Sequence, residues 1–348
     1  MNSLLIKNLL IPGYEKVIEA IDSTTGLHAF VAIHNTTLGP SLGGMRMYPY
    51  SSREEALMDV LRLSKAMTLK SALAETGLGG GKSVLIGDPR KNKTKELLFS
   101  FAEVLNTLKG SYIAAEDVGI SAENLLIIRQ KSPYVAALPL PGSSGDPSRF
   151  TAFGIYRGLQ ALSQTLFGTP SLKGRSFAIQ GIGSVGSKLC HFLFWEGAKL
   201  YITDLEADKV QSHVERFGAE GVDPDKILNL PVDIICPCAM GGILNSITIP
   251  HLQCKAVGGA ANNQLQNLED GLLLQERSIL FAPDFVINSG GIINASSEFL
   301  PGGYDPKVAQ NKTAHIFDTL LEIFHVSKTT GKSTALIANE IAESKLHQ

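Results

Sequence analysis

One glycine pattern in the sequence is typical of dinucleotide binding. The stretch GIGSVG follows the β-favouring run SFAIQ and precedes the helical segment KLCHFLFWE. In such a strand–turn–helix unit Gly181 permits a tight turn, Gly183 lets the backbone approach a pyrophosphate, and Gly186 lets the helix pack closely on the strand. Ser184 and Val185 then begin the helix, whose free N–H groups and partial positive charge face the phosphates. The pattern therefore predicts a dinucleotide site.

Asp204 gives this predicted site a preference between NAD and NADP. It ends the run KLYITD, 18 residues after Gly186. A carboxylate that holds the adenosine ribose hydroxyls is expected after ~20 residues. An acid there repels a 2′-phosphate, and Leu205 and Glu206 supply no arginine, so NAD is favoured. The alternative is a glycine turn without a cofactor, in which Asp204 only caps a helix; the complete strand–helix–strand context argues against it.

Three charged residues in the first half of the chain occupy settings that suit acid–base chemistry. Lys82 follows the glycines 79–81 and precedes the apolar run SVLIG. Glycines leave space for a ligand, and a lysine desolvated there beside another cation would have a lowered pKa, as a base near neutral pH requires. Lys70 ends a helical segment, where a charge that favours the helix C-terminus explains it equally well. Asp117, in AAEDVG, could equally belong to a solvated loop.

The segment GGGKS is not a phosphate-binding P-loop. In the pattern G-x-x-x-x-G-K-[ST] the first glycine would stand at position 76, which is Thr76. The residues after Lys82 also favour a strand, whereas the lysine of a P-loop opens a helix. Both differences exclude the P-loop interpretation.

Two regions with different patterns are expected to position these residues. Residues 1–137 mix β-favouring runs at 28–34 and 83–87 with helical periodicity at 54–70, which Ser51 and Ser52 would begin. After a Gly, Pro and Ser loop at 139–148, a helical segment leads into the expected strands SFAIQ, KLYIT, VDIIC, KAVGGA and FVIN. This order predicts an α/β fold of two domains, an N-terminal α/β domain and a Rossmann domain over 138–310, the latter with a parallel sheet between helices.

Composition limits the classes of partner. The 348 residues are 44% hydrophobic and 18% charged with a net charge of −2, which argues against nucleic acid or an anionic membrane as the main partner. No apolar run approaches the ~20 residues of a transmembrane helix, and the first residues do not resemble a signal peptide, so a cytoplasmic protein is expected. We expect reduced, packed thiols and no metal, because no zinc-type spacing occurs among Cys190, Cys236, Cys238 and Cys254.

Together the motifs resemble the glutamate/leucine/phenylalanine/valine dehydrogenase superfamily, and within it the leucine dehydrogenases. The resemblance runs through LGPSLGGMRMYPY, MTLKSALAETGLGGGKSVLIGDPRK, AAEDVG, GSSGDPSRFTAFGIYRG, the glycine pattern, ICPCAMGG, GGAANNQL and APDFVINSGGIIN. It implies a catalytic and oligomerisation domain facing an NAD domain across a cleft, with C-terminal helices of about 311–348 packing back on the first. It also implies reversible oxidative deamination of an amino acid to a 2-oxo acid and ammonia by a homo-oligomer, such as an octamer.

The resemblance also implies roles for individual residues. Lys82 would activate water for attack on an imine carbon, and Asp117 would pass protons to the departing ammonia. Lys70, with the backbone of Gly43 and Gly44, would hold the substrate α-carboxylate. Other matching positions are Met67 on the substrate side and, on the cofactor side, Thr151, Cys238, Ala239, Asn262 and Asn288.

One position predicts the class of substrate. Where glutamate dehydrogenases typically carry a lysine that binds the side-chain carboxylate, this chain has Leu42. A carboxylate beside leucine would be desolvated without a partner, at a cost of several kcal/mol. The expected pocket is therefore apolar, with Leu42, Ala115 and Ile292 as its walls, and suits leucine or another branched-chain amino acid.

The sequence leaves other substrates open. The same chemistry on phenylalanine, valine or tryptophan remains an alternative, because one methylene discriminates by only about 1–3 kcal/mol. A non-catalytic NAD-binding regulatory protein would have no reason to keep both lysines and Asp117. A 2-hydroxy-acid dehydrogenase would need a His–carboxylate pair, which is not found after the glycine pattern. Departures from typical leucine dehydrogenases put the shape of the pocket in doubt; they are Met45, Arg149 and the segment Glu75-Thr76-Gly77.

Overall fold

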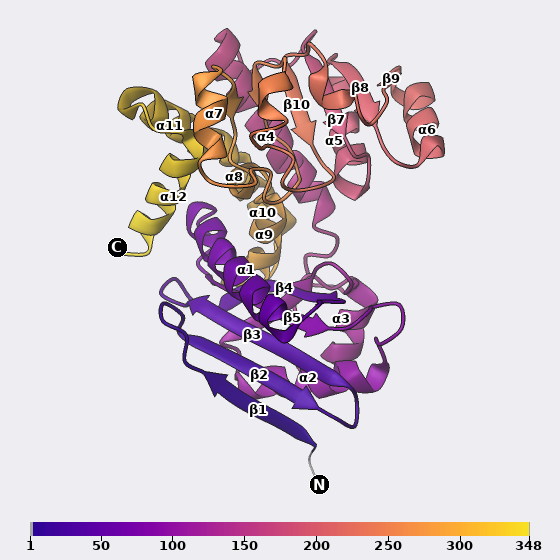
Figure 1. Ribbon diagram of the computed structural model, residues 1–348, viewed down its shortest axis with the longest axis vertical. Coiled ribbons are helices and arrows are strands. Elements are labelled where there is room, and N and C mark those ends of the chain that lie inside the picture. The colour runs from indigo at the N-terminus through magenta and orange to yellow at the C-terminus, as the bar shows by residue number, and fades with distance from the viewer. Residues whose placement is uncertain (1–2, 348) are drawn as a thin grey trace. The chain divides into compact units, whose positions relative to one another are not determined.

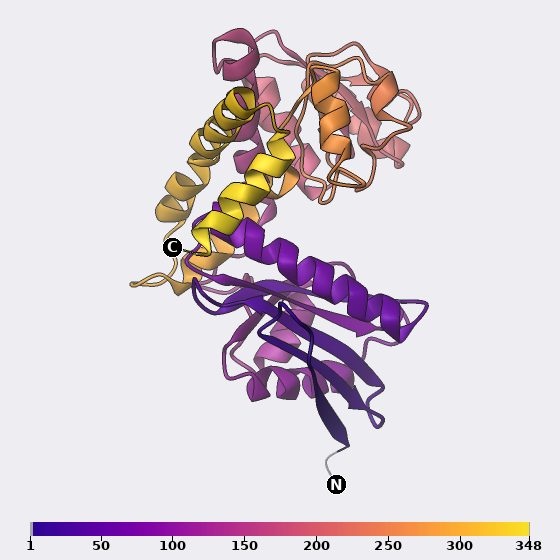
Figure 2. The same cartoon turned by 60° about the vertical axis from the view of Figure 1, so that its left-hand side comes forward.

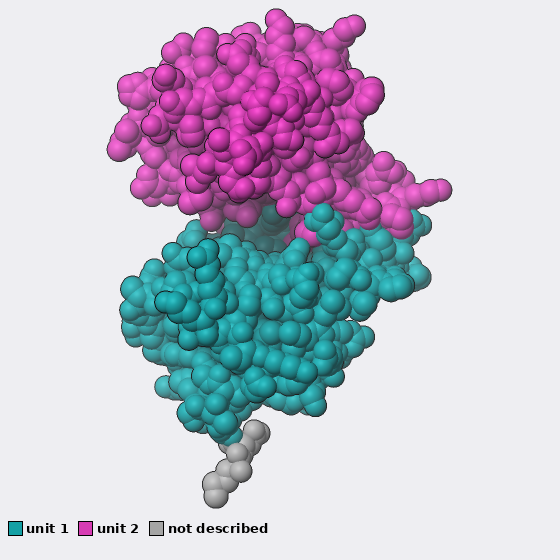
Figure 3. Space-filling view, turned by 90° about the vertical axis from the view of Figure 1, so that its right-hand side faces the viewer, with its two compact units in different colours: residues 1–146, 295–305, 345–348 teal, residues 147–294, 306–344 magenta. Residues whose placement is uncertain are grey.

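The computed structural model describes residues 3–347 and divides into two units, each with its own sheet (Figures 1 and 3). Unit 1 contains residues up to 146, residues 295–305 and the chain end from 345; unit 2 contains 147–294 and 306–344. The division after Asp146 lies inside the loop expected at 139–148. Residues 306–344 belong to unit 2. The reason is that the helix Ile316–Thr330 packs along the helix Ser148–Phe167 of unit 2.

Unit 1 is built on a six-stranded mixed sheet in the order β1-β2-β3-β5-β4-β6. Strands β1, β2, β3 and β5 pair with one another antiparallel in that order, whereas β4 lies parallel to both β5 and β6. The strands are β1 (Leu4–Leu9), β2 (Lys16–Asp22), β3 (Leu27–Asn35), β4 (Ser41–Tyr48), β5 (Gly79–Ile86) and β6 (Tyr112–Glu116). The helices are α1 (Arg53–Leu73), α2 (Lys95–Thr107) and α3 (Ala122–Arg129).

Helices cover both faces of this sheet, with α1 lying across one of them (Figure 2). Alternate residues of β3 therefore enter different cores: Val31 and Ile33 join the core that includes α2 and α3, while Phe30 and Ala32 join the core with α1. The Ser52 side chain accepts the Glu55 N–H and begins α1, as predicted. The strands expected at 28–34 and 83–87 are confirmed, but β5 begins four residues earlier and includes the glycine run.

The glycine run lets α1 lie close to β5. A Cβ at Gly80 would lie 2.1 Å from the Thr68 backbone nitrogen, and one at Gly81 would lie 2.7 Å from Ser41 Oγ. A larger residue at Gly80 would push the helix from the strand, and one at Gly81 would collide with the Ser41 side chain of β4. Gly80 therefore sets the distance between α1 and β5.

Unit 2 contains a six-stranded parallel sheet in the order β12-β11-β10-β7-β8-β9. Counted along the chain from β7, this is the order 3-2-1-4-5-6 of a Rossmann fold. The predicted strands SFAIQ and KLYIT coincide with β7 and β8, VDIIC overlaps β10, and KAVGGA shrinks to β11. The strands are β7 (Ser176–Gln180), β8 (Lys199–Thr203), β9 (Glu220–Gly221), β10 (Ile234–Pro237), β11 (Ala256–Val257) and β12 (Leu280–Phe281).

The expected strand FVIN is wrong: it is the helix α8 (Asp284–Ile287), and the sixth strand is the preceding Leu280–Phe281. Pro283 stands directly before α8, and Val286 and Ile287 are buried. Gly158 makes room for Ile287, since a Cβ at Gly158 would lie 2.4 Å from Ile287 Cγ1. Packing against the helix Ser148–Phe167 therefore overrides the β preference of Val and Ile.

The helices of unit 2 flank its sheet and extend to the chain end (Figure 1). One of them, α9, reaches two residues into unit 1. No helix within residues 3–347 is both long and apolar enough to cross a membrane. The helices are α4 (Ser148–Phe167), α5 (Ser184–Trp195), α6 (Ala207–Phe217), α7 (Asp270–Glu276), α8 (Asp284–Ile287), α9 (Gly290–Ser296), α10 (Pro306–Ala314), α11 (Ile316–Thr330) and α12 (Thr334–Lys345).

Replacing Gly80 by alanine is expected to destabilise unit 1. The new methyl group would collide with the α1 backbone at Thr68, and overpacking of this kind costs about 1–3 kcal/mol of unfolding free energy. Urea denaturation followed by circular dichroism measures the change. Met58→Ala, on the exposed side of α1, serves as the control and should stay within about 0.5 kcal/mol of the unaltered protein. Equal stability of the two variants would contradict the close contact of α1 with β5.

Candidate active site

Lys82 and Asp117 meet on the face of the unit 1 sheet that α1 covers. Lys82 lies on β5, two residues before Val84, which packs in the α1 core; Asp117 directly follows β6. The Lys82 ammonium forms an ion pair with Asp117 Oδ2. Only 8% of the Lys82 side chain and 19% of the Asp117 side chain are exposed. The pair is therefore held largely away from water.

Gly44 on β4 leaves the space in which these two side chains meet. A Cβ at Gly44 would lie 2.8 Å from Lys82 Nζ and 2.8 Å from Asp117 Cβ. Gly43 and Gly44 pair with Ala114 and Ala115 of β6. On the other side of β4, neither glycine has a paired residue in β5. The missing side chain thus lets two strands on either side of β4 place their charged groups in contact.

The Tyr112 hydroxyl forms hydrogen bonds with the backbone of this glycine pair. Tyr112 is fully buried, and its hydroxyl donates to the Gly43 carbonyl oxygen over 3.0 Å and lies 3.0 Å from Ser83 Oγ. Burial raises the pKa of Tyr112, so the hydroxyl stays protonated. The sequence analysis did not find Tyr112, because an isolated tyrosine in an apolar strand carries no signal beyond its β preference.

Asp117 is ionised in spite of its burial. Burial by itself would raise its pKa, but the charges of Lys82 and Arg46 and the hydrogen bond from Lys82 outweigh it and hold the pKa below its usual value. Lys82 was expected beside another cation; its ion-pair partner is this carboxylate, whose Oδ2 also accepts from the Arg46 guanidinium. The open position at Gly44 admits Asp117 from the far side of β4.

The other substrate-side positions of unit 1 lie on β4, β6 and α1. Lys70 is in the last turn of α1 and Met67 lies one turn before it; both are half-buried. Leu42 is 2% exposed on β4, and the half-buried Ala115 pairs with Gly44. Ile292 is buried on α9 of unit 2.

Met45 lies away from the Lys82–Asp117 pair. It is fully buried in the core that includes α2 and α3, on the face of β4 opposite to Gly44. Replacement of a typical threonine there changes that core and not the face that carries the ion pair. Arg149, the second residue of α4, lies over the Phe150 ring at 5.0 Å in unit 2.

In unit 2 the predicted glycine pattern forms a turn that leads directly into α5. Gly181 has a φ of +93°, which favours glycine, and a Cβ at Gly186 would lie 2.1 Å from the Gly181 oxygen. Gly183 precedes the first residue of α5, and no side chain caps that helix. A Cβ at Gly183 would have no neighbour within 4 Å. Uncapped amides beside open space suit a pyrophosphate, so these residues fit a dinucleotide.

Asp204 is fixed beside this turn at the end of β8. Its Oδ2 accepts the Ile182 N–H over 2.9 Å, and its Oδ1 accepts the Glu206 N–H over 3.1 Å. Burial raises its pKa, but the hydrogen bonds from Ile182 and Glu206 outweigh it, so the pKa is lowered and the group is a carboxylate at neutral pH. It therefore offers two acceptor oxygens where ribose hydroxyls would bind.

The segment after β10 completes the turn region. The Cys238 N–H donates to the Gln180 carbonyl over 2.7 Å, and a Cβ at Gly181 would lie 2.7 Å from the Ala239 Cβ. Parallel strands β7 and β10 are neighbours at the point where the strand order reverses, which is where Rossmann folds bind ligands. The structure thus brings Cys238 and Ala239 to the glycine turn.

Two expected asparagines contact each other elsewhere in unit 2. Asn288 Nδ2 donates to Asn262 Oδ1 over 2.9 Å and to the Ala260 carbonyl over 3.0 Å. Thr151 lies in the first turn of α4, where its hydroxyl donates to Pro147 O over 3.0 Å, and a Cβ at Gly291 would lie 2.7 Å from that hydroxyl. These residues and the Lys82–Asp117 pair belong to different units.

Both parts of the chain match known family descriptions. Residues 15–134 match "Glu/Leu/Phe/Val dehydrogenase, dimerisation domain", and residues 201–345 match "Glutamate/Leucine/Phenylalanine/Valine dehydrogenase". The chain belongs to the glutamate/leucine/phenylalanine/valine dehydrogenase family. This membership confirms the resemblance seen in the motifs.

Relatives of known activity match this family member over almost its whole length. It is 46% identical to a leucine dehydrogenase of Thermoactinomyces intermedius over 334 residues, 96% of this chain and 91% of the relative. It is 44% identical to a phenylalanine dehydrogenase of Caldalkalibacillus thermarum, over 97% of this chain and 92% of the relative. The crystal structure of L-tryptophan dehydrogenase from Nostoc punctiforme superimposes with a TM-score of 0.85 at 39% identity, covering 96% of each chain.

The family defines the class of reaction. The protein is an oxidoreductase that acts on the CH–NH2 group of an amino acid and uses a nicotinamide dinucleotide. The uncapped start of α5 and the Asp204 carboxylate are the features of unit 2 that fit such a cofactor.

Replacing Gly183 by alanine should weaken the dinucleotide without weakening the fold. The methyl group meets no protein atom within 4 Å but occupies the space in which a pyrophosphate would approach the backbone. We expect the Kd for NADH, measured by fluorescence titration, to rise about tenfold or more, which corresponds to about 1.4 kcal/mol. Melting curves provide the control: Gly183→Ala should keep the melting temperature, whereas Gly186→Ala, which collides with Gly181, should lower it. An unchanged NADH affinity of Gly183→Ala would place the phosphates elsewhere.

Proposed function

We propose that the protein catalyses the reversible, NAD-dependent oxidative deamination of L-leucine and other branched-chain amino acids to 2-oxo acids and ammonia. The observation that carries the proposal is the buried contact of Lys82 with Asp117 at Gly44, on a sheet face where Leu42 is the neighbouring side chain of β4. The leucine dehydrogenase of Thermoactinomyces intermedius, at 46% identity, supports the choice of substrate.

The ion pair suits the handling of protons after the α-hydride has left the substrate. Bound NAD supplies the acceptor for that hydride. Lys82 would pass a proton of its ammonium group to Asp117 and, as the neutral amine, take a proton from the water that attacks the substrate imine carbon; its ammonium would then stabilise the oxygen that develops charge. Asp117 would receive a proton and deliver it to the nitrogen that leaves as ammonia. Transfers of this kind commonly contribute about 10²–10⁴ in rate.

The rest of the proposed site holds and orients the two reactants. Lys70, with the backbone at Gly43 and Gly44, would bind the α-carboxylate of the substrate. The Gly43 carbonyl already accepts the Tyr112 hydroxyl, so this strand is fixed before substrate binds. The apolar walls would be Leu42, Met67, Ala115 and Ile292, and the residues beside the nicotinamide would be Thr151, Asn262 and Asn288.

Asp204 supports NAD in preference to NADP. Its carboxylate is held by two backbone N–H groups and has a lowered pKa, so its charge persists at neutral pH. A 2′-phosphate would meet this charge at close range and be repelled. For the assembly we propose a homo-oligomer, since residues 15–134 match a dimerisation domain, and specifically an octamer, which the resemblance of the motifs implies. Light scattering coupled to gel filtration measures its mass.

A substrate panel tests the proposed reaction. NADH absorbance at alkaline pH is followed with NAD or NADP and with leucine, isoleucine, valine, phenylalanine, tryptophan or glutamate. We expect turnover of the three aliphatic amino acids with NAD, and none with glutamate because Leu42 leaves its side-chain carboxylate without a partner. Preference for an aromatic amino acid would replace the proposed substrate, and turnover of glutamate would contradict the role of Leu42.

Lys82→Ala should abolish turnover of the preferred substrate. The variant removes the proposed base and leaves Asp117 without its ion-pair partner, so kcat should fall by at least about 10³. NADH binding, measured by fluorescence, should be unchanged because unit 2 carries the glycine turn. A Lys82→Ala enzyme that retains most of its kcat would overturn the proposed mechanism.

A further inference from the structure

Arg46 connects Asp117 to a second carboxylate. On β4, Arg46 lies two residues after Gly44, and its Nε donates to Asp117 Oδ2 over 3.2 Å. This is the same oxygen that contacts Lys82. The other side of the guanidinium, Nη1, donates to Asp59 Oδ2 of α1 over 3.1 Å. One planar cation therefore spans the distance between β6 and α1.

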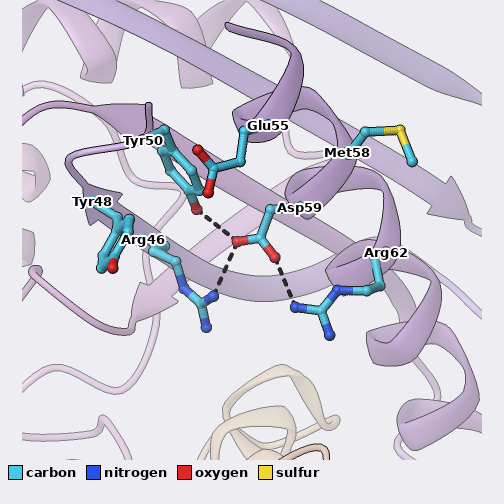
Figure 4. A pocket seen from close by; sticks show the side chains of 7 residues that line it. All are labelled: Arg46, Tyr48, Tyr50, Glu55, Met58, Asp59 and Arg62. Atoms are coloured by element: carbon cyan, nitrogen blue, oxygen red, sulfur yellow. Dashed lines mark hydrogen bonds and ion pairs between the residues drawn. The ribbon is translucent and has the colours of Figure 1, made fainter. Parts of the chain in front are cut away.

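Asp59 is itself held in place (Figure 4). Its Oδ2 accepts the Tyr50 hydroxyl over 2.6 Å, and its Oδ1 accepts Arg62 Nη2 over 2.8 Å. Burial raises the pKa of Asp59, but the hydrogen bonds from Tyr50 and Arg62 and the charge of Arg46 outweigh burial. The pKa is therefore lowered, and Asp59 remains a carboxylate. Burial raises the pKa of Tyr50, which therefore keeps donating under alkaline conditions.

These residues line a cavity of unit 1 that is connected to the Lys82–Asp117 ion pair through Arg46. The cavity measures about 380 Å³, and its lining consists of Arg46, Tyr48, Tyr50, Glu55, Met58, Asp59 and Arg62. Arg46 is 22% exposed and Asp59 15% exposed, whereas Arg62 is 57% exposed. The ion pairs of Arg46 with Asp117 and Asp59 are thus largely shielded from water, whereas Arg62 is exposed to solvent.

We propose that Arg46 is a positioning residue that fixes the Asp117 carboxylate beside Lys82, and that Asp59 anchors Arg46 for this task. The inference rests on the proposed role of Asp117. Because Arg46 uses two different N–H groups for two carboxylates, it fixes a direction as well as supplying charge, which a single ammonium does not do.

The arrangement also decides the charge of Asp117. Among the described residues, Lys82 from β5 and Arg46 from β4 face Asp117, and Tyr112 of β6 interacts with it electrostatically. Burial favours the protonated acid, and the two cations oppose it. Without Arg46 the pKa of Asp117 rises, so the carboxylate is lost at a higher pH. The acid limb of the rate profile should therefore move to higher pH.

Three variants separate the effect of the Arg46 charge on Asp117 from its effect on the orientation of the Asp117 carboxylate. Arg46→Gln removes both, so kcat/KM for the preferred amino acid should fall about 10- to 100-fold, with an acid limb at higher pH. Arg46→Lys restores the charge but not the bridge, so the limb should return toward that of the unaltered enzyme while kcat stays low. Asp59→Asn should lower kcat without moving the limb to higher pH, because Arg46 keeps its charge and loses its anchor.

Arg62→Gln is the matched control, since it removes the same charge from the same cavity without touching Asp117. Its exposed side chain predicts a change of less than about twofold in kcat/KM. An Arg46→Gln enzyme with unchanged kcat/KM and acid limb would overturn the proposal, and so would an equal effect of Arg62→Gln. Melting curves show which variants fold; if Arg46→Gln does not, Arg46→Lys and Asp59→Asn decide.

A measurement without substrate separates this proposal from the proposed function. The infrared band of the Asp117 carboxyl group, identified by its absence in Asp117→Asn, is followed against pH in the full chain with and without Arg46→Lys or Arg46→Gln. Protonation at higher pH in Arg46→Gln supports the proposal even if the panel shows no turnover of leucine. An identical titration in all three proteins contradicts it, whatever the substrate.

Discussion

The structure of unit 1 depends on how closely its backbone segments approach at glycine. Gly80 brings β5 against α1, Gly43 brings β4 against the Gly81 carbonyl, and Gly44 leaves the space that Lys82 and Asp117 share. With a Cβ at Gly43 or Gly80 the backbone segments would have to separate, and a Cβ at Gly44 would displace the two charged side chains. The buried ion pair is therefore a consequence of backbone contact: the charges meet because no side chain lies between them.

The same sheet explains why a buried charge pair is tolerated. Leaving one carboxylate alone in such a place would be costly, and Asp117 is instead in contact with two cations while Asp59 balances the second of them. Tyr112 and Tyr50 supply hydroxyl groups to the backbone and to Asp59 from within unit 1. The result is an alternating series of acids and bases in which each group is fixed by its neighbours.

Much of this could be predicted from the sequence where a local pattern carries the information. The helix at 54–70, the strands SFAIQ and KLYIT and the glycine turn before Asp204 follow from periodicity and spacing. The segment FVIN could not be predicted, because its helical form depends on the room that Gly158 leaves for Ile287. Arg46, Asp59 and Tyr112 were also missed. An arginine or a tyrosine in a strand has no motif, and its partner lies on another element.

The sequence by itself determined the strands and helices that carry a local pattern and the Rossmann turn with its acidic residue, while the roles of Lys70, Lys82 and Asp117 stay predictions from the family resemblance. It did so because glycine conformation, strand alternation and helix periodicity act over a few residues. Only the tertiary structure decided that Lys82 forms an ion pair with Asp117, and that Arg46 joins this pair to Asp59. These contacts join residues far apart in the chain, across strands whose neighbours are set by the sheet order β5-β4-β6 and by the packing of α1.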